Sequence, residues 1–221
     1  MSANTEAPVT SRRERNKQQK RDRIVTAARA LFYAQGYKKT TTLQIAHAAQ
    51  VASGTLFLYA KAKEDLLLMV FYEEFMAIID AISVSADDTR PVEQQVLALF
   101  DTLFDYHARD IDLSRELMKV ITFVSDPDRR GDLIEIHFAI ERKLHKTVAN
   151  AQARGVLSER ADALIIARTL FSVYFHTLLF WLGSLGDKDR RDADLRDLVG
   201  GVIAMASSGA GGLDARHAAR S

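Results

Sequence analysis

The sequence predicts an all-α fold. Three prolines occur among 221 residues, and no segment shows the alternation of valine, threonine and aromatic residues that is typical of strands. Apolar residues recur instead at the helical period of about 3.6 residues through many long segments. Because 48% of the residues are hydrophobic, the chain can bury a sizeable core. We expect about nine helices, arranged in one large or two small domains.

The composition argues against several classes of protein. With no cysteine, the chain cannot form a disulfide, a thiolate metal site or a thiol nucleophile. The N-terminus is charged and lacks an apolar core, so no signal peptide is expected. The most apolar stretch, 165–181, is interrupted by Arg168 and His176, so neither a membrane span nor a membrane partner is expected. These features fit a cytoplasmic protein.

The net charge of +1 conceals an uneven distribution. Residues 1–66 hold 12 Lys and Arg against 5 Asp and Glu, a net charge of +7, whereas residues 67–221 hold 18 against 24, a net charge of −6. A basic first third joined to an acidic remainder suits a domain that binds a polyanion, followed by a second domain that the polyanion repels. A merely solvated basic face is the alternative.

The N-terminal segment should lead into a long amphipathic helix. Residues 1–17 are polar and lack apolar periodicity, so we expect a flexible basic arm that either contacts a nucleic-acid backbone or minor groove, or only solubilises the chain. The first helix is predicted over 16–35. Its apolar stripe consists of Ile24, Ala27, Ala28, Leu31 and Phe32. Gly36 should end it with a left-handed cap.

Residues 40–59 predict two short helices joined by a tight corner. The first begins near Thr41, whose hydroxyl can cap unpaired amides. Its apolar residues are Leu43, Ile45, Ala46 and Ala49. Val51 should fill the corner, and the second helix, over 53–59, should bury Leu56. The residues that it should hold outward are Ser53, Thr55, Phe57 and Tyr59. Two crossed helices with a hydroxyl-rich outer face are typical of a helix-turn-helix that binds duplex DNA.

Residues at fixed spacing within 21–67 resemble the TetR family of transcriptional regulators. The matching positions are Gly36, Tyr37, Thr40, Thr41, Ile45, Ala46, Val51, Gly54, Thr55, Leu56, Phe57, Tyr59, Lys63, Glu64 and Leu66. The resemblance implies an N-terminal three-helix helix-turn-helix DNA-binding domain over 18–66. It also implies a C-terminal helical effector-binding and dimerisation domain over 67–207. Residues 208–221 are expected to form a flexible tail.

The same resemblance implies which residues meet DNA. Thr40 and Thr41 would cap the second helix and touch phosphate, the segment 53–55 would open the recognition helix at the major groove, and Lys63 would bind phosphate. The full set of implied DNA-binding residues is Thr40, Thr41, Thr42, Ser53, Gly54, Thr55, Phe57, Leu58, Tyr59 and Lys63.

Four positions depart from the family pattern. Phe57 lacks a phenol donor, which favours an apolar contact such as a thymine methyl, and Leu58 removes a polar reader of bases. Ala52 and Ala62 stand where a serine often caps a helix, which leaves those helix starts to backbone groups or DNA phosphate. We therefore expect few direct hydrogen bonds to bases and considerable reliance on phosphates and DNA shape.

The rest of the chain predicts further amphipathic helices. They are expected over 63–82, from Pro91 onward, and over 114–124, 130–153, 158–182 and 191–206. The segment 158–182 is apolar nearly all round, so it must be buried either within a larger core or against another subunit. In the family that the chain resembles, helices 8 and 9 of two chains form a four-helix bundle, which implies a homodimer. Burial within one chain is the alternative.

Aromatic residues at helical spacing are more often core than pocket, but the resemblance implies a small-molecule cavity among them. The candidate lining residues are Phe71, Phe75, Phe100, Phe104, His107, Phe123, His137, Phe138, Phe171 and Phe175. The two histidines could orient a polar group of an effector or be satisfied core residues. His137, Glu141 and His145 recur at every fourth residue, but helix rotation spreads the three, so no metal site is expected.

No enzyme signature is present. The sequence lacks a glycine-rich phosphate loop after a strand, a nucleophile elbow and a Cys/His pair, and no cofactor is expected. We expect a sequence-specific DNA-binding regulator: a cytoplasmic homodimeric repressor that a small, largely apolar effector releases from a palindromic operator. An activator with the same DNA head, or a helical ligand-binding protein that has lost operator recognition, remain as alternatives.

Overall fold

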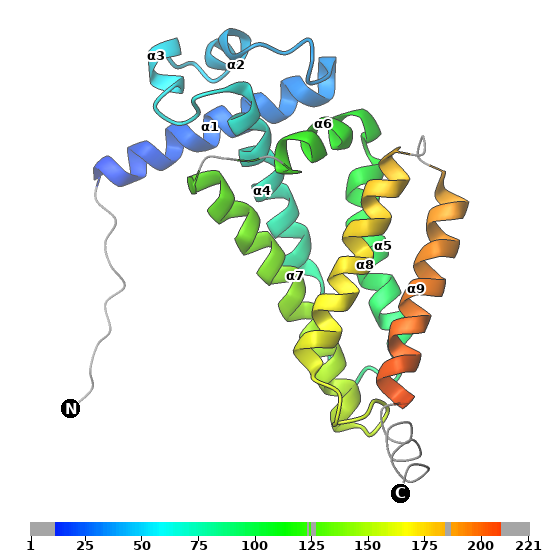
Figure 1. Ribbon diagram of the computed structural model, residues 1–221. Helices are drawn as coiled ribbons and strands as arrows, with labels where there is room; N and C mark the ends of the chain where they lie inside the picture. Colours follow the sequence, from blue (N-terminus) through cyan, green and yellow to red (C-terminus); the bar gives the residue numbers. More distant parts are fainter. Residues whose placement is uncertain (1–11, 123, 125–126, 184–186, 209–221) are drawn as a thin grey trace, which may run out of the picture. The chain divides into compact units, whose positions relative to one another are not determined.

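A computed structural model describes residues 12–122, 124, 127–183 and 187–208, and the regular elements within these ranges are all α-helices (Figure 1). The helices are α1 (Arg12–Gln35), α2 (Thr42–Ala48), α3 (Ser53–Leu56), α4 (Lys63–Ala81), α5 (Val92–Ala108), α6 (Ile111–Thr122), α7 (Pro127–Ala153), α8 (Ala163–Gly183) and α9 (Lys188–Ser208). The prediction of an all-α fold is therefore confirmed.

The chain divides into two compact units, one up to Phe71 and one from Tyr72 onward. The boundary falls inside α4, so this helix begins in the N-terminal unit and ends in the C-terminal one. In the N-terminal unit, α2 packs against both α1 and α3. Its core residues include Ile24, Phe32, Ile45, Leu56 and Leu66, all fully buried.

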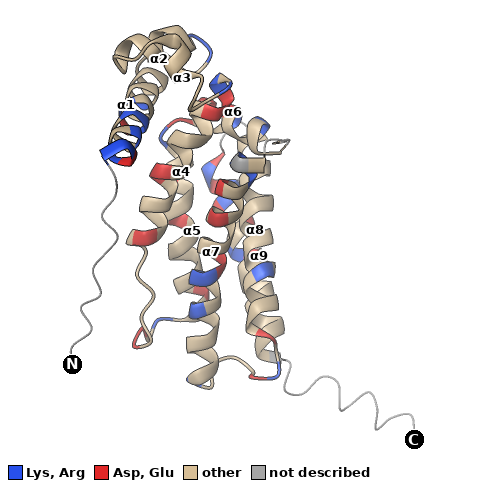
Figure 2. Ribbon diagram, turned by 90° about the vertical axis from the view of Figure 1, so that its left-hand side faces the viewer, with Lys and Arg blue, Asp and Glu red and all other residues tan. Residues whose placement is uncertain are grey.

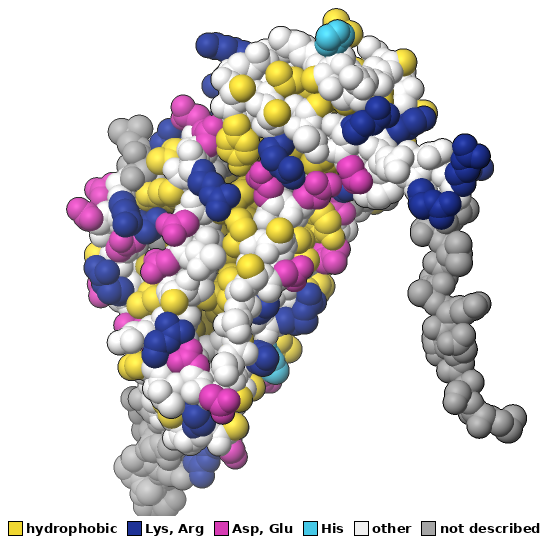
Figure 3. Space-filling view, turned by 180° about the vertical axis from the view of Figure 1, so that it is seen from behind, with side chains coloured by type: hydrophobic (Ala, Val, Ile, Leu, Met, Phe, Trp, Pro, Cys, Tyr) yellow, Lys and Arg dark blue, Asp and Glu magenta, His cyan; other side chains and the backbone are white. Residues whose placement is uncertain are grey.

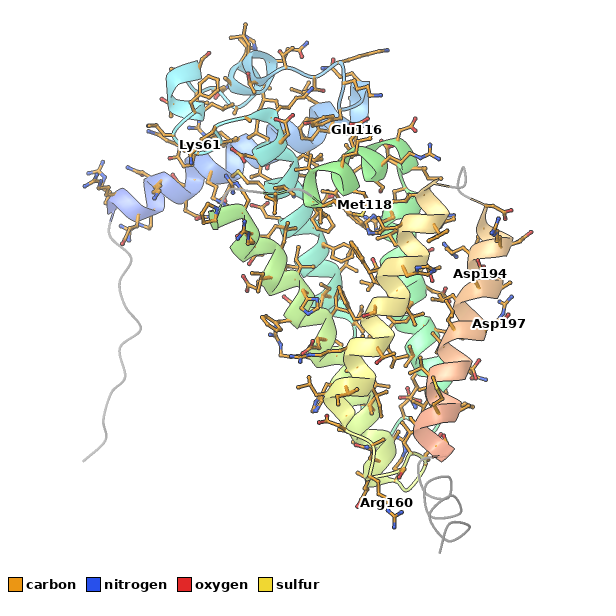
Figure 4. All side chains as sticks on the ribbon, viewed as in Figure 1. Lys61, Glu116, Met118, Arg160, Asp194 and Asp197 are labelled. Carbon is orange, nitrogen blue, oxygen red and sulfur yellow. The ribbon has the colours of Figure 1, made fainter. Side chains whose placement is uncertain are left out.

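The C-terminal unit is organised around α8, which packs most extensively against α7 and α9. Helix α5 in turn contacts α6, α7 and α9. The aromatic residues Phe75, Phe100 and Phe104 are almost fully buried in this unit, and Met118 on α6 is also buried in it (Figure 4). By length and composition α8 would suffice to cross a membrane, contrary to the expectation that Arg168 and His176 exclude this.

Several helix boundaries differ from the predicted ones, and α6, α7 and α9 each begin three residues before the predicted position. Helix α1 begins at Arg12, so six residues assigned to the flexible arm are helical; the exposed side chains of Gln18 and Asp22, which are hydrogen-bonded at 2.7 Å, support its early turns. Helix α3 ends at Leu56, with residues 57–59 in turns. The remainder of the arm, the segment 209–221 and Phe123 lie outside the described residues.

Helix α8 begins at Ala163, and not at the predicted position 158. The cap is Asp162, whose Oδ1 accepts hydrogen bonds from the amides of Leu164 at 2.7 Å and Ile165 at 3.3 Å. The preceding loop is held by Gln152, whose amide nitrogen donates to two loop carbonyls. An aspartate cap can start the helix at this position without help from Ser158.

Gly36 confirms the predicted end of the first helix. Its φ is +83°, in the left-handed region that glycine adopts at no steric cost, and its amide donates to the carbonyl of Phe32 at 3.0 Å. A residue with a side chain would be strained at this φ. The glycine thus turns the chain away from α1 and toward α2.

Candidate functional site

The start of α2 is defined by a capping box. The amide of Gln44 donates to the hydroxyl of Thr41 at 3.2 Å, and the side-chain oxygen of Gln44 accepts from the amide of Thr41 at 2.9 Å. The same oxygen accepts from the side chain of Gln35 on α1 at 3.1 Å. The reciprocal bonds satisfy two otherwise unpaired amides and fix where α2 begins, and the bond from Gln35 ties this start of α2 to α1.

Thr40, which the resemblance assigns to the cap of α2 and to a phosphate contact, is buried. Its side chain is 1% exposed, and its hydroxyl donates to the carbonyls of Gly36 at 2.9 Å and Leu31 at 3.2 Å. A hydroxyl that is engaged in this way cannot reach a phosphate. Thr40 therefore ties the loop before α2 to the end of α1, and the exposed Thr41 is the cap.

The corner between α2 and α3 is a tight turn. Gln50 adopts a φ of +54°, a region that non-glycine residues seldom occupy, and the amide of Val51 donates to the carbonyl of Ala46 at 3.0 Å. Val51 is half-buried in this corner. The turn sends the chain directly into α3.

The segment from α2 through the turns after α3 exposes several of the residues that were predicted to meet DNA. Ser53, Gly54, Phe57 and Leu58 are exposed, while Thr42, Thr55 and Tyr59 are half-buried. No side chain caps the N-terminus of α3 at Ala52, as the sequence predicted. Leu56 alone is buried to anchor the segment.

Leu43 is exposed on α2, although the sequence pattern predicted it inside. Its exposed fraction is 67%, and those of Phe57 and Leu58 are 49% and 83%. The core beneath α2 is already filled by Ile45 and Ala46, which are buried. Large apolar side chains exposed to this degree on neighbouring helices suit contact with a partner surface that has apolar groups of its own, such as thymine methyls.

Lys63 is engaged inside the N-terminal unit, which the sequence did not predict. Its ammonium donates to the carbonyls of Tyr37 at 2.9 Å and Thr40 at 3.1 Å, and it lies 4.2 Å from the centroid of the Tyr37 ring. These contacts join the start of α4 to the loop between α1 and α2. Because an ammonium has three donors, any phosphate contact would have to use the third.

The start of α4 is capped by Asp65. Its Oδ2 accepts from the amides of Lys61 at 2.7 Å and Ala62 at 3.2 Å. A carboxylate of the first turn of α4 therefore satisfies the amides of the two residues that precede the helix, and the expectation that Ala62 leaves the helix start to backbone groups or DNA phosphate stays a prediction.

Positive charge is concentrated on exposed parts of the N-terminal unit. The first turns of α1 carry exposed basic residues (Figure 2), and Lys61 is exposed between α3 and α4 (Figure 4). The phenol of Tyr59 donates to the carbonyl of Lys17 on α1 at 3.4 Å. On the face of the C-terminal unit seen in Figure 3, by contrast, basic and acidic side chains are interspersed.

Three of the predicted effector-binding aromatics are packed as core. The ring of Phe100 stacks on Tyr174 at 5.4 Å, and Phe104 meets the rings of Tyr174 and Trp181 edge to face at 5.2 and 5.7 Å. Phe75 contacts the ring of Tyr106 at 5.2 Å. Phe71 is also buried.

His107 lies in the same core with a hydrogen-bond partner. Its Nδ1 is 3.2 Å from the hydroxyl of Ser114, which donates to the carbonyl of His107 at 3.1 Å. Since the Ser114 hydroxyl proton is used in this bond, Nδ1 of His107 carries the ring proton and donates it to the Ser114 oxygen. Burial lowers the pKa of His107 to about 3, so the ring is neutral at physiological pH.

The other predicted effector-binding residues lie nearer the surface, where α7 meets α8. The His137 ring is 4.3 Å from Phe171, Phe171 stacks on Phe175 at 6.3 Å, and Phe138 is 44% exposed. The structure thus separates this outer group from the buried one. No group of three or more potential metal ligands is found among the described residues.

An ion pair joins α7 and α8 beside this outer group. Glu141 is 6% exposed, and its Oε2 lies 3.1 Å from Nε of Arg168 and 3.4 Å from Nε2 of His137. The Arg168 that interrupts the apolar pattern of α8 is therefore paired with a buried carboxylate of α7.

Three residues of α8 that carry polar atoms were not predicted as site residues from the sequence. Tyr174, Thr177 and Trp181 are 3%, 3% and 5% exposed, and they lie three and four residues apart, on one face of the helix. The signal that could have revealed them is their spacing, because they place three polar atoms along one face of an apolar helix.

A groove of about 340 Å³ lies where α4 ends and α5 begins. Its lining residues include Ile78, Ile82, Gln95, Leu99, Thr102 and Thr147. None of the aromatic residues predicted to bind an effector lines it.

Comparison with known proteins identifies the N-terminal unit. Residues 24–70 match the family model described as bacterial regulatory proteins, tetR family. The HTH-type transcriptional repressor KstR of Mycobacterium tuberculosis is 28% identical over 202 residues, which cover 90% of this chain and 86% of the repressor. The fatty acid metabolism regulator protein of Bacillus subtilis is 23% identical over 172 residues, covering 76% of this chain and 86% of that protein.

The solved structures extend the likeness along most of the chain. FadR of Thermus thermophilus, a TetR-family transcriptional repressor solved in complex with lauroyl-CoA, is 25% identical with a TM-score of 0.65, covering 86% of this chain and 94% of FadR. These relatives are transcriptional regulators and not enzymes. The helix-turn-helix of α2 and α3, the all-helical C-terminal unit and the family match lead to one conclusion: the chain belongs to the TetR family of DNA-binding transcriptional regulators.

Proposed function

We propose that the protein is a homodimeric repressor that binds a palindromic operator and leaves it when a small, largely apolar effector binds the C-terminal unit. The observation that carries the proposal is the surface formed by α2 and α3. There the Thr41–Gln44 capping box fixes the start of α2, the Gln35–Gln44 hydrogen bond ties α2 to α1, and Ser53, Phe57 and Leu58 are exposed. A short exposed helix on a rigid support is suited to the major groove.

A second copy of the chain is proposed to cover α8 and α9. Intramolecular packing buries only one face of α8, although the helix is apolar nearly all round. The large apolar residues left exposed on these two helices are Leu164, Ile165, Leu179, Phe180, Leu198 and Met205. A two-fold interface on this surface would hold two DNA-binding units for the two halves of a palindrome.

The effector is proposed to be a fatty acyl thioester, and the protein to act in the cytoplasm. The similarity to FadR bound to lauroyl-CoA and to a fatty acid metabolism regulator supports this chemistry, as does the apolar interior of the C-terminal unit. Binding would shift the population toward a state that no longer fits the operator.

The proposal predicts salt-dependent binding to the DNA upstream of the regulated genes. In fluorescence anisotropy with a labelled duplex, we expect the affinity to fall about a thousandfold between 50 and 200 mM salt, as for roughly six neutralised phosphates. Lauroyl-CoA should release the duplex. Transcript levels in a deletion strain should rise; a fall would instead make the protein an activator. Absence of duplex binding at low salt would contradict the proposal.

The dimer is tested by Phe180→Glu. Phe180 is 61% exposed, so its replacement should leave the folded chain intact while placing two charges in the proposed two-fold interface. A two-fold interface contains Phe180 from both chains, so the substitution removes two aromatic rings from it. We therefore expect the dimer dissociation constant, measured by sedimentation, to rise about 100-fold. Ile134→Glu on α7, where the isoleucine is 46% exposed, is the matched control. Equal self-association of both variants would argue against this interface.

A further inference from the structure

Three buried polar atoms of α8 have no hydrogen-bond partner within the described part of the chain. They are the hydroxyl of Tyr174, the hydroxyl of Thr177 and the indole nitrogen of Trp181. Successive residues of the three are three and four positions apart, which places Thr177 about 4.5 Å and Trp181 about a further 6 Å along the helix axis. We name these three residues the α8 donor stripe.

The unpaired state of the stripe contrasts with its neighbours on the same helix. The hydroxyl of Thr169 donates to the carbonyl of Ile165 at 2.8 Å, and that of Ser172 donates to the carbonyl of Arg168 at 2.9 Å. This back-bonding is the usual way in which a helical hydroxyl is satisfied. Thr177 does not use it, although leaving a buried hydroxyl unpaired is unfavourable. Three such groups on one face of one helix leave hydrogen-bonding capacity that a bound ligand can use.

The chemistry of the stripe selects hydrogen-bond acceptors. An indole nitrogen can only donate, and both hydroxyls can donate. Burial raises the pKa of the Tyr174 phenol, which keeps its proton in place. The guanidinium of Arg191, itself paired with Asp192, lies 5.1 Å from the centroid of the Trp181 ring. Its positive charge favours oxygen atoms with partial negative charge.

The surroundings of the stripe are aromatic. Tyr174 contacts Phe100 and Phe104, and Trp181 contacts Phe104. On its outer side, the ring of Tyr174 is 6.2 Å from that of the half-buried Phe171. The stripe is thus a row of donors among aromatic side chains, and a few polar groups within an apolar lining are typical of small-molecule sites.

We propose that the α8 donor stripe binds the polar segment of the effector, with Tyr174 and Thr177 donating to one carbonyl oxygen and Trp181 to a second one further along. This rests on the proposed function, since it names how the effector is recognised. An acyl thioester of coenzyme A has carbonyls in such a series, because the thioester carbonyl is followed by the amide carbonyls of the pantetheine arm. The stripe would then distinguish a thioester from an alkyl chain of equal length.

The test uses Trp181, which is the single tryptophan of the chain, as the reporter. Titration of the full-length protein with lauroyl-CoA should change its emission, and S-dodecyl-CoA, which lacks the thioester carbonyl, should bind about tenfold more weakly. Tyr174→Phe and Thr177→Val should each weaken lauroyl-CoA binding about tenfold and lose much of the preference for the thioester. Thr169→Val, which removes an exposed and back-bonded hydroxyl, should retain both affinity and preference.

A second measurement concerns the ligand-free protein. Removing an unpaired buried hydroxyl should leave the thermal unfolding midpoint of Tyr174→Phe and of Thr177→Val unchanged or should raise it. A lower midpoint in both variants would mean that these hydroxyls have protein partners. That result would overturn the proposal. Equal binding of the thioester and the thioether would also overturn it. If lauroyl-CoA releases DNA from the wild type and from both variants at the same concentration, the proposed function stands and this inference fails. If lauroyl-CoA alters neither emission nor DNA binding, both are overturned.

Discussion

Replacing Lys63 with methionine is expected to lower the free energy of unfolding of the N-terminal unit by about 2 kcal/mol. The substitution keeps the apolar stem but removes the ammonium, which donates to the carbonyls of Tyr37 and Thr40 and lies over the Tyr37 ring. A hydrogen bond to a charged group contributes about 1.5–3 kcal/mol, and partial exposure of Lys63 reduces the sum of the two. Urea denaturation measures the loss.

DNA binding separates this structural role from a phosphate contact. If Lys63 only braces the loop before α2, the Lys63→Met variant should bind all duplexes more weakly with an unchanged salt slope. If its third donor also binds phosphate, the slope should fall by about 0.9 for each phosphate lost. Lys61→Met is the control, because Lys61 is exposed in the same linker (Figure 4) and its replacement should preserve stability. A stable Lys63→Met variant would contradict the assigned bracing role.

Lowering the pH from 7.5 to 5 is expected to remove about 2 kcal/mol of stability through His107 alone. Burial lowers the pKa of His107 from 6.5 to about 3, so between these values the unfolded chain binds a proton that the folded chain does not. The stability is therefore complete above pH 6.5 and is lost as the pH falls toward 3, at about 1.36 kcal/mol per pH unit. The full effect below pH 3 would be about 5 kcal/mol.

The His107→Asn variant isolates this contribution from that of other titrating groups. The asparagine amide can take the place of Nδ1 and donate to Ser114, but it does not titrate. We expect the stability difference between wild type and variant, measured by urea denaturation, to shrink by about 2 kcal/mol between pH 7.5 and 5. A difference that stays constant across this range would mean that His107 is protonated in the folded protein.

The local signals in the sequence were sufficient for the N-terminal unit. Gly36 as a left-handed cap, Thr41 as the cap of α2, and Leu56 as the buried anchor of α3 were all predicted from residue type and position. Each depends on backbone geometry within a few residues. The errors came where helical periodicity alone does not decide which residues of a short helix face the core. Leu43 fits the helical pattern but is exposed, because Ile45 and Ala46 already fill the core beneath α2.

The roles of polar residues depended more strongly on tertiary structure. Thr40 and Lys63 matched positions that the family resemblance assigns to DNA, yet both are engaged within the unit. Asp65 accepts from the two amides that precede α4, at a helix start where Ala62 supplies no side-chain cap. In these hydrogen bonds the partner is a backbone carbonyl or amide, which almost any residue can supply. The pattern of side chains in the sequence therefore does not predict which residue is the partner.

The sequence by itself determined the helical fold, the helix-turn-helix and the family, because helical periodicity, caps and turns are short-range properties. Tertiary structure alone decided which aromatic residues are core and which lie near the surface, that His107 is buried and neutral, and that the polar atoms of Tyr174, Thr177 and Trp181 are buried together. Burial depends on which faces of distant helices meet. Helix α8 is apolar nearly all round, so only its packing against α7 and α9 shows which side is inside.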